Sequence, residues 1–192
     1  MYDTLRQYIS SRVPFTDSDF AVIKDVFRPK TLKKNEFLLR EGSVADDTAF
    51  VVTGALRMYF VDEGGKEYIT QFAIEEWWIG DRESLANRTP SKYNIDALED
   101  STVLVIGNAG MSELERRVPA FKDMMTAIKE RRSFVKQQRV VSALADSAEK
   151  KYKDFVETYP ELIRRVPQHM IASYLGITPE TLSRLRARTV RG

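Results

Sequence analysis

The spacing of apolar residues changes twice along the chain and divides it into three parts. Near the N-terminus, apolar residues recur at helical spacing on either side of Pro14, which predicts short helices within residues 2–27. Thr16 is the predicted N-cap of the second of these helices. From Thr31 to Ile106 the pattern shortens to β-rich runs with glycines between or beside them, which is typical of an antiparallel barrel or sandwich. The predicted strands are residues 36–41, 48–53, 56–61, 67–73 and 102–106.

Helical spacing returns after Pro119 and continues to about Ala145 without a glycine or proline. The pattern predicts one long helix, which at 1.5 Å per residue would exceed about 30 Å. Because this is more than a small domain requires, we expect part of its apolar stripe to pack against a second copy across a twofold axis. The alternative is a helix that lies wholly on its own barrel. A new helix is predicted to start at Asp146, which has capping-box spacing to Glu149.

Near its C-terminal end the chain contains two helical patterns separated by one glycine. Residues 168–175 carry an apolar face, and Gly176 permits the left-handed conformation that ends such a helix. Thr178 is the predicted N-cap of the next helix, with Pro179 as its first residue and Leu182 pointing back to the preceding helix. Two helices joined by a tight glycine turn have the layout of a helix-turn-helix, whose second helix enters the major groove of DNA.

The opposite face of this second helix supplies the predicted DNA contacts. Arg184 can form a bidentate bond to guanine O6 and N7, and Glu180 can accept a hydrogen bond from cytosine N4. Phosphate contacts fix register rather than sequence. The predicted phosphate contacts are Thr181, Ser183, Arg186 and Arg188, and Gln168 and Thr178 complete the predicted DNA-binding set.

The distribution of charge supports a polyanionic partner. The net charge of the chain is only +2, but residues 1–120 hold 15 basic and 20 acidic residues, whereas residues 121–192 hold 15 and 8. The two parts therefore carry −5 and +7. A basic C-terminal part favours DNA because each neutralised phosphate releases condensed counterions. On charge alone, solvated helices rich in lysine and arginine are an equal alternative.

The composition excludes several kinds of chemistry. With no cysteine and one histidine, the chain cannot build a disulfide framework, an iron–sulfur cluster or a histidine-based metal site, so we expect no enzyme of the metal-dependent barrel type. The single histidine, His169, is expected to face solvent or phosphate. No stretch approaches the roughly 18 apolar residues of a membrane span, and the N-terminus lacks the apolar core of a signal peptide. We therefore expect no membrane association and a cytoplasmic location.

Taken with these features, the chain resembles the Crp/Fnr superfamily of transcription regulators. The run I-A-x-x-L-G-I-T-x-E-T-L-S-R over residues 171–184 resembles the helix-turn-helix of that family. Upstream, the motifs L-K-K-N-E, E-G, G-G-K-E, G-D and A-L-E-D-S follow in the order of its β-roll, between residues 32 and 101. The resemblance covers about residues 30–188. It implies homodimers that read a (pseudo)palindromic DNA site through residues 179–188, with RNA polymerase as a further candidate partner.

The fold class implied by the resemblance is α+β with three parts. Residues 1–118 would form an antiparallel β-roll (jelly-roll, cyclic-nucleotide-binding-like) sensor domain with flanking helices. Residues 119–145 would form the dimerisation helix, and residues 146–192 a winged-helix-like helix-turn-helix domain. Because Gly192 follows the second helix closely, we expect the wing to be reduced or missing. Pro179 occupies a position where some relatives place a base-reading arginine, so the operator should differ from theirs.

The nucleotide cassette of the family is degenerate in this sequence. The family offers a Gly-Glu pair, then an arginine and a small hydroxyl residue, which bind the ribose and the cyclic phosphate. Here the pair is Gly80-Asp81, and the arginine position falls near Ser91, with Lys92 next. We therefore predict no cofactor and expect no ordinary cyclic-nucleotide binding, while another small-molecule effector remains an alternative. The candidate effector pocket comprises Phe72, Trp78, Gly80, Asp81, Ser91, Lys92 and Tyr93, although aromatic residues at such positions more often belong to a barrel core.

One functional alternative follows from the same elements. A β-roll that binds a small molecule or a protein, with a helix-turn-helix that serves only for packing, would need no sequence-specific DNA reading. The basic C-terminal part argues against this alternative.

Overall fold

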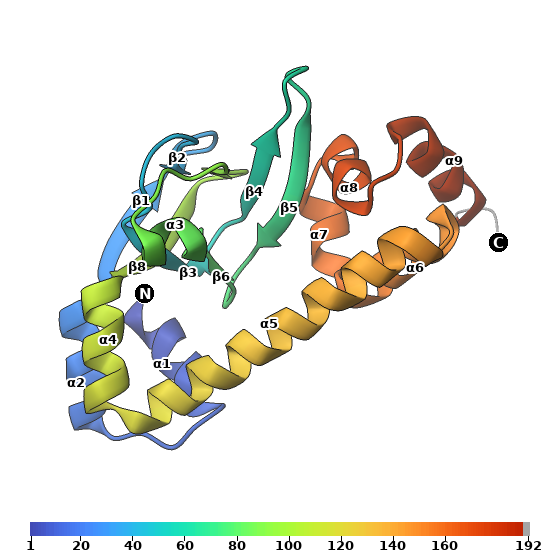
Figure 1. Cartoon of the computed structure of the whole chain (residues 1–192). Coiled ribbons are helices and arrows are strands. Elements are labelled where there is room, and N and C mark those ends of the chain that lie inside the picture. Colours follow the sequence, from blue (N-terminus) through green and yellow to red (C-terminus); the bar gives the residue numbers. More distant parts are fainter. Residues whose placement is uncertain (190–192) are drawn as a thin grey trace. The chain divides into compact units, whose positions relative to one another are not determined.

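The computed structural model describes residues 1–189 and divides the chain into two compact units (Figure 1). One unit comprises Met1–Phe60 and Thr70–Glu130, and the other comprises Val61–Ile69 and Arg131–Gly192. Antiparallel strands dominate the first unit and helices the second, which confirms the predicted α+β class. The predicted reduction of the wing concerns residues beyond Thr189 and lies outside the described residues.

Two short helices open the first unit, α1 (Tyr2–Ser10) and α2 (Asp17–Val26), as the sequence predicts. Thr16 caps α2: its Oγ1 accepts from the backbone N–H of Asp19 at 3.2 Å, and Asp19 accepts from the backbone N–H of Thr16 at 2.8 Å. This reciprocal pair is a capping box, which satisfies a backbone donor that the helix itself leaves unpaired. The predicted cap is therefore confirmed.

The strands form two four-stranded sheets with the orders β1-β8-β3-β6 and β2-β7-β4-β5. All five predicted strands are present. Three others were not predicted, because β1 is largely polar and exposed, β6 has two residues and β7 has four. The strands are β1 (Arg28–Leu32), β2 (Phe37–Leu39), β3 (Asp47–Thr53), β4 (Leu56–Val61), β5 (Glu67–Ala73), β6 (Trp78–Ile79), β7 (Asn94–Ala97) and β8 (Ser101–Gly107).

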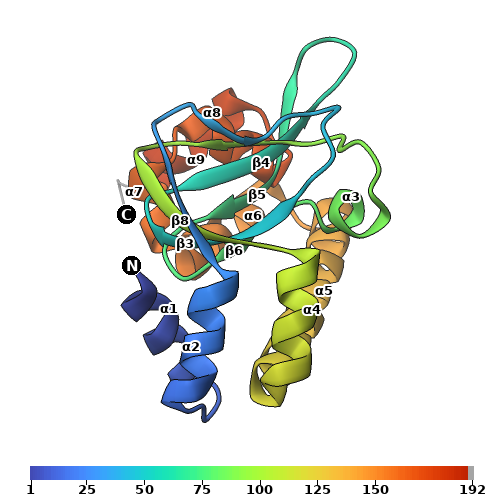
Figure 2. The same cartoon turned by 90° about the vertical axis from the view of Figure 1, so that its left-hand side faces the viewer.

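The first unit has two apolar cores, one on each face of the β1-β8-β3-β6 sheet. Side chains such as Val51, Met58 and Ile95 fill the space between the two sheets. On the other face, strand residues that include Phe50 and Trp78 pack against helices α1, α2, α4 (Asn108–Arg117) and the start of α5. Figure 2 shows α1, α2 and α4 on the same side of the strands. Trp78 therefore belongs to the helix-covered core and not to the interior of the roll.

Helix α5 spans Pro119–Ala145 and has the predicted bounds. Its 27 residues make it about 40 Å long. Its first turns bury Phe121, Met124 and Met125 in the helix-covered core. Further along, its apolar side chains are exposed, with Phe134 at 65% and Leu144 at 85%.

The second unit contains α6 (Ala148–Thr158), α7 (Pro160–Arg165), α8 (Gln168–Leu175) and α9 (Pro179–Thr189). The predicted helix start at Asp146 is one residue too early. The N-cap of α6 is Ser147, whose Oγ accepts from the backbone N–H of Lys150 at 3.2 Å, while Asp146 pairs with the Lys150 ammonium at 2.8 Å. The buried side chains of this unit include Ile69, Tyr152, Phe155, Leu162, Val166, Ile171, Ala172 and Leu182.

Helix α8 is held by side chains from other segments of the second unit. The Arg139 guanidinium lies over the Tyr174 ring at 3.9 Å, and its Nη2 donates to the Tyr174 carbonyl at 3.2 Å. Burial raises the pKa of the Tyr174 hydroxyl. Ser173 Oγ donates to the carbonyl of Glu67 at 2.9 Å and accepts from the N–H of Ile69 at 3.0 Å.

Candidate nucleic-acid interface

The turn between α8 and α9 has the conformation predicted from its glycine. Gly176 adopts φ 65° and ψ 35°, the left-handed region that L side chains rarely enter. Its N–H donates to the Ser173 carbonyl at 3.1 Å, and the N–H of Ile177 donates to the Ala172 carbonyl at 3.0 Å. These bonds satisfy carbonyls at the end of α8 and reverse the chain within two residues. The prediction for Gly176 is confirmed.

The start of α9 is also as predicted. Thr178 Oγ1 accepts from the backbone N–H of Thr181 at 3.2 Å, and Pro179 is the first residue of the helix. Leu182 is fully buried and fixes the inner face of α9. A capped start and one anchored face determine which side chains point outward.

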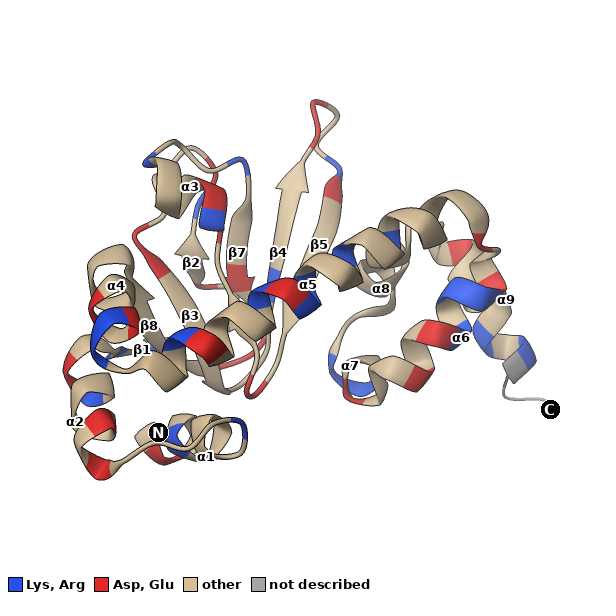
Figure 3. Cartoon of the chain, turned by 60° about the horizontal axis from the view of Figure 1, so that its bottom comes forward, with Lys and Arg blue, Asp and Glu red and all other residues tan. Residues whose placement is uncertain are grey.

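The outward face of α9 carries the predicted base-reading residues. Glu180 and Arg184 lie one helical turn apart and are exposed, as are Ser183 and Arg188. Thr181 and Arg186 are half-buried because they flank the buried side of the helix. Figure 3 shows the basic segments along α9.

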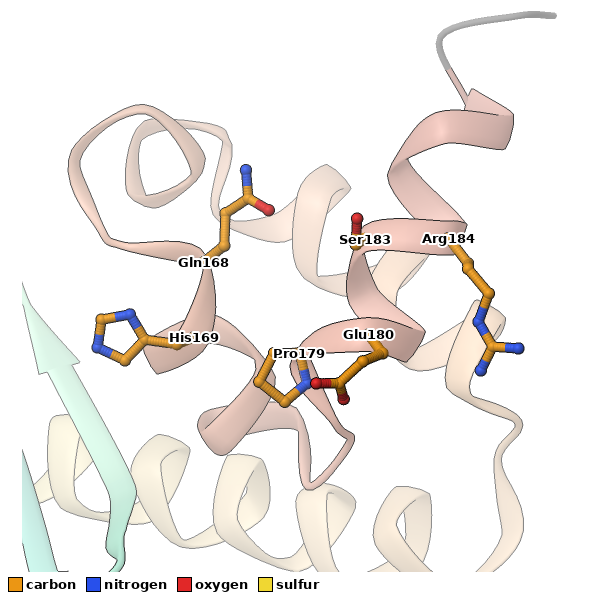
Figure 4. A pocket seen from close by; sticks show the side chains of 6 residues that line it. All are labelled: Gln168, His169, Pro179, Glu180, Ser183 and Arg184. Atoms are coloured by element: carbon orange, nitrogen blue, oxygen red, sulfur yellow. The ribbon is translucent and has the colours of Figure 1, made fainter.

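A hollow of about 560 Å³ lies between the first turns of α8 and α9. Of the predicted DNA-binding residues it brings together Gln168, Glu180, Ser183 and Arg184, whose side chains come from both helices (Figure 4). Its other lining residues are His169 and Pro179. The sequence did not predict this juxtaposition, because it depends on how two helix starts approach one another in the tertiary structure. Thr178, Thr181, Arg186 and Arg188 are not among the lining residues.

Local hydrogen bonds determine the charge of Glu180 and the orientation of Arg184, the two predicted base-reading residues. The pKa of Glu180 is lowered, first by a hydrogen bond from its own backbone N–H and then by the Thr178 hydroxyl and the charge of Arg184. The Glu180 carboxylate is therefore ionised in neutral solution. Arg184 Nη2 donates to Thr181 Oγ1 at 3.3 Å, and that oxygen lies 3.1 Å from Thr178 Oγ1. A hydroxyl chain along α9 thus connects the helix cap to the guanidinium.

The seven residues of the predicted effector pocket differ in their surroundings. Asp81 and Ser91 are buried and hydrogen-bonded to one another at 2.7 Å, next to Gly80. Trp78 lies in the helix-covered core, where it contacts Phe27 and Phe50. Phe72 is buried and Tyr93 is half-buried, with its backbone N–H donating to Ser91 Oγ at 3.0 Å. Lys92 is exposed, and its ammonium lies 5.6 Å from the Tyr93 ring.

The described residues offer no metal centre and no membrane span. Within residues 1–189, no group of three or more His, Asp or Glu side chains is placed to hold a metal ion. Over the same range no helix has the length and apolar character needed to cross a bilayer.

Comparison with known proteins identifies a domain family for residues 29–117 and relatives that cover most of the chain. Residues 29–117 match the family model of the cyclic nucleotide-binding domain. The transcriptional activator protein Anr of Pseudomonas aeruginosa is 25% identical over 193 residues, which cover 94% of this chain and 76% of that protein. The transcriptional activator protein FnrA of Stutzerimonas stutzeri is 27% identical over 184 residues, which cover 88% and 74%.

Solved structures share the fold. FixK2 from Bradyrhizobium japonicum has a TM-score of 0.67 at 22% identity and covers 85% of this chain and 84% of its own. A crp/fnr-family transcriptional regulator from Eubacterium rectale has a TM-score of 0.66 at 16% identity and covers 93% and 85%. Residues 29–117 therefore carry a cyclic nucleotide-binding domain, the whole chain is similar to transcriptional activators of the Crp/Fnr type, and the solved structures share its fold.

Proposed function

We propose that this regulator binds duplex DNA as a homodimer and reads a (pseudo)palindromic site with residues 179–188. The observation that carries the proposal is the exposed pair of opposite charges, Glu180 and Arg184, on the outward face of a capped helix. Such a pair matches base edges in the major groove, where guanine presents two acceptors and cytosine a donor.

We assign base reading to Arg184 and Glu180. The Arg184 guanidinium would bond guanine O6 and N7, and the ionised Glu180 carboxylate would accept from cytosine N4. Because Arg184 donates to Thr181 Oγ1, Thr181 would orient the guanidinium. Thr178 would contribute through the helix cap.

The remaining contacts are proposed for phosphates. Gln168 and Ser183 line the hollow between the two helix starts, where their side-chain donors would meet a phosphate. Arg188 is exposed near the end of α9, and Arg186 is half-buried beside it. These residues would fix the register of the helix in the groove.

The proposed dimer interface is the distal part of α5. Phe134, Val140, Val141 and Leu144 are exposed and fall within an arc of about 120° on the helix. A contiguous apolar stripe of this kind marks an interaction surface, and a second copy would bury the same stripe by symmetry. Static light scattering at micromolar concentration should therefore give the mass of a dimer, and Leu144→Glu should shift the mass toward 22.1 kDa.

The proposed division of labour follows the sequence. Residues 1–118 would serve as the sensor-like domain, 119–145 as the dimerisation helix and 146–192 as the DNA-binding domain. Since both curated relatives are named transcriptional activators, RNA polymerase is the further proposed partner. A cytoplasmic location, where the DNA of a bacterial cell lies, is part of the same proposal.

The salt dependence of DNA binding tests this function. Affinity for a duplex should fall steeply as salt rises, because each phosphate contact releases counterions. Arg184→Ala should remove sequence preference, whereas Arg116→Ala, the same charge change at an exposed position of helix α4, should retain it. An affinity that does not change with salt, or equal sequence preference in both variants, would refute the proposal.

A further inference from the structure

The β-roll contains a buried polar cluster that DNA reading does not use. Its members are Asp81, Ser84 and Ser91, which are 5%, 1% and 3% exposed. Buried polar side chains are costly unless each is hydrogen-bonded, so the partners of these three residues define what the cluster does.

Both oxygens of the Asp81 carboxylate are occupied by internal donors. Oδ1 accepts from the backbone N–H groups of Glu83 and Ser84, at 3.1 and 3.2 Å, and so caps helix α3 (Arg82–Asn87). Oδ2 accepts from Ser91 Oγ at 2.7 Å. Two backbone amides and one hydroxyl therefore surround a carboxylate that belongs to the protein.

The cluster also joins three segments of the roll. The backbone of Ser91 accepts from Gly42 at 2.7 Å and donates to the Ser43 carbonyl at 2.8 Å. Ser84 Oγ accepts from the N–H of Ala45 at 2.9 Å and donates to the Thr89 carbonyl at 2.6 Å. Helix α3, the loop before β3 and the segment before β7 are thus connected by buried hydrogen bonds.

These residues do not fit a cyclic nucleotide. Asp81 and Ser91 stand at the two positions where the family's cassette places the ribose-binding glutamate and the phosphate-binding arginine, and here the two side chains bond to one another. Two basic residues close to Ser91 in sequence contact other side chains. Arg88 Nη1 donates to Asp46 at 3.0 Å, and the Lys92 ammonium lies over the Tyr93 ring.

We propose that the Asp81 carboxylate is the built-in anion of this cassette, and that the roll is closed to cyclic nucleotides. The carboxylate occupies two backbone amides at the start of α3 and the Ser91 hydroxyl, so these donors are not available to the phosphate of a nucleotide. A second anion on the same donors would meet like charge without a balancing cation, which is unfavourable at short range and low dielectric. The Asp81–Ser91 bond then holds the cassette in its closed form, independently of whether α9 reads DNA.

Calorimetric titration of the full chain with cyclic AMP and with cyclic GMP tests closure. No saturable heat is expected up to about 1 mM nucleotide. Saturable one-to-one binding of either nucleotide below that concentration would overturn the proposal. The titration contains no DNA. Its outcome therefore tests the closed cassette separately from the proposal that α9 reads DNA.

A double-mutant cycle tests the Asp81–Ser91 bond itself. Asp81→Ser keeps an N-cap oxygen for α3 but is too short to reach Ser91. Ser91→Ala should lower Tm by about 3–8 °C in the wild type. The shift should be about half as large in the Asp81→Ser background, where Ser91 Oγ keeps its bonds to the Tyr93 backbone. In the Glu83→Gln background, which changes an exposed carboxylate of the same helix, the full shift should remain. Equal shifts in the wild-type and Asp81→Ser backgrounds would contradict the bond.

Discussion

Asp81 and Glu180 are both carboxylates at the start of a helix, yet they differ in burial and in how many of their oxygens the protein itself occupies. Asp81 is buried, and internal donors take both of its oxygens. Glu180 is exposed in the first turn of α9, and its ionised carboxylate borders a hollow. The same functional group therefore stabilises the fold in the roll and remains available to another molecule on α9. The comparison agrees with the proposed DNA binding by the C-terminal helices and with the proposed closed cassette.

The largest expected effect is on stability, from Asp81→Ala. The change removes the cap of α3 and leaves the buried Ser91 hydroxyl without its carboxylate partner, at a cost of about 3 kcal/mol in the free energy of unfolding. Urea denaturation measures this loss. Sequence preference for DNA should persist in the folded fraction. A loss below about 1 kcal/mol would show that the cluster does not hold the cassette.

Arg184→Lys should have the next largest effect, on discrimination rather than on folding. Lysine keeps the charge but lacks the planar fork that bonds guanine twice, so discrimination against the wrong base should fall by about 1–3 kcal/mol. Fluorescence anisotropy with matched and mismatched duplexes measures the difference. Urea denaturation should give an unchanged midpoint. If lysine discriminated as well as arginine, Arg184 would be a phosphate contact and not a base reader.

Thr178→Ala tests the helix cap under the reading face. Loss of the Thr178–Thr181 bond should destabilise the start of α9 by about 1 kcal/mol and weaken DNA binding to a similar degree. Thr178→Ser keeps the capping oxygen and should retain both properties. Amide hydrogen exchange at Thr181 and Leu182 reports the local change. Equal protection in the alanine and serine variants would remove the cap from the account.

The smallest expected effect concerns pH. The backbone N–H of Glu180, the Thr178 hydroxyl and the Arg184 charge lower the pKa of Glu180 in the folded state. Ionised Glu180 therefore stabilises the folded state at pH values above the ordinary glutamate pKa of 4.5. That contribution should disappear as pH falls through the lowered value, and Glu180→Gln should not show it. Carbon-detected NMR titration of the Glu180 carboxyl provides the midpoint. A midpoint at or above that of a model glutamate peptide would contradict the described hydrogen bonds.

Elements with a long run of regularly spaced apolar residues, or with characteristic turn residues, were predictable from the sequence. The uninterrupted helical spacing of apolar residues predicted the bounds of α5. Gly176, Thr178 and Pro179 predicted the turn after α8 and the start of α9. Short elements were not. The two-residue strand β6 has too little alternation to reveal its face, so Trp78 could not be assigned to the helix-covered core in advance.

Contacts between distant segments also required the structure. The glycine and carboxylate of the cassette were visible in the sequence, but the bond from Ser91 to Asp81 depends on how the segment before β7 folds onto α3. Adjacent capping candidates were ambiguous as well: Asp146 and Ser147 both precede α6, and the local backbone selects Ser147. Tertiary geometry therefore decides the roles that residue type alone leaves open.

The most direct test of the account is selection of duplexes from a random pool by the full chain, with no small molecule added. The wild type and Arg116→Ala are expected to enrich the same palindromic site with a G·C pair in each half. Arg184→Ala is expected to lose the preference at that pair while its fold is intact. Enrichment of no sequence by the wild type, or of the same site with the same preference by Arg184→Ala, would contradict DNA reading by α9.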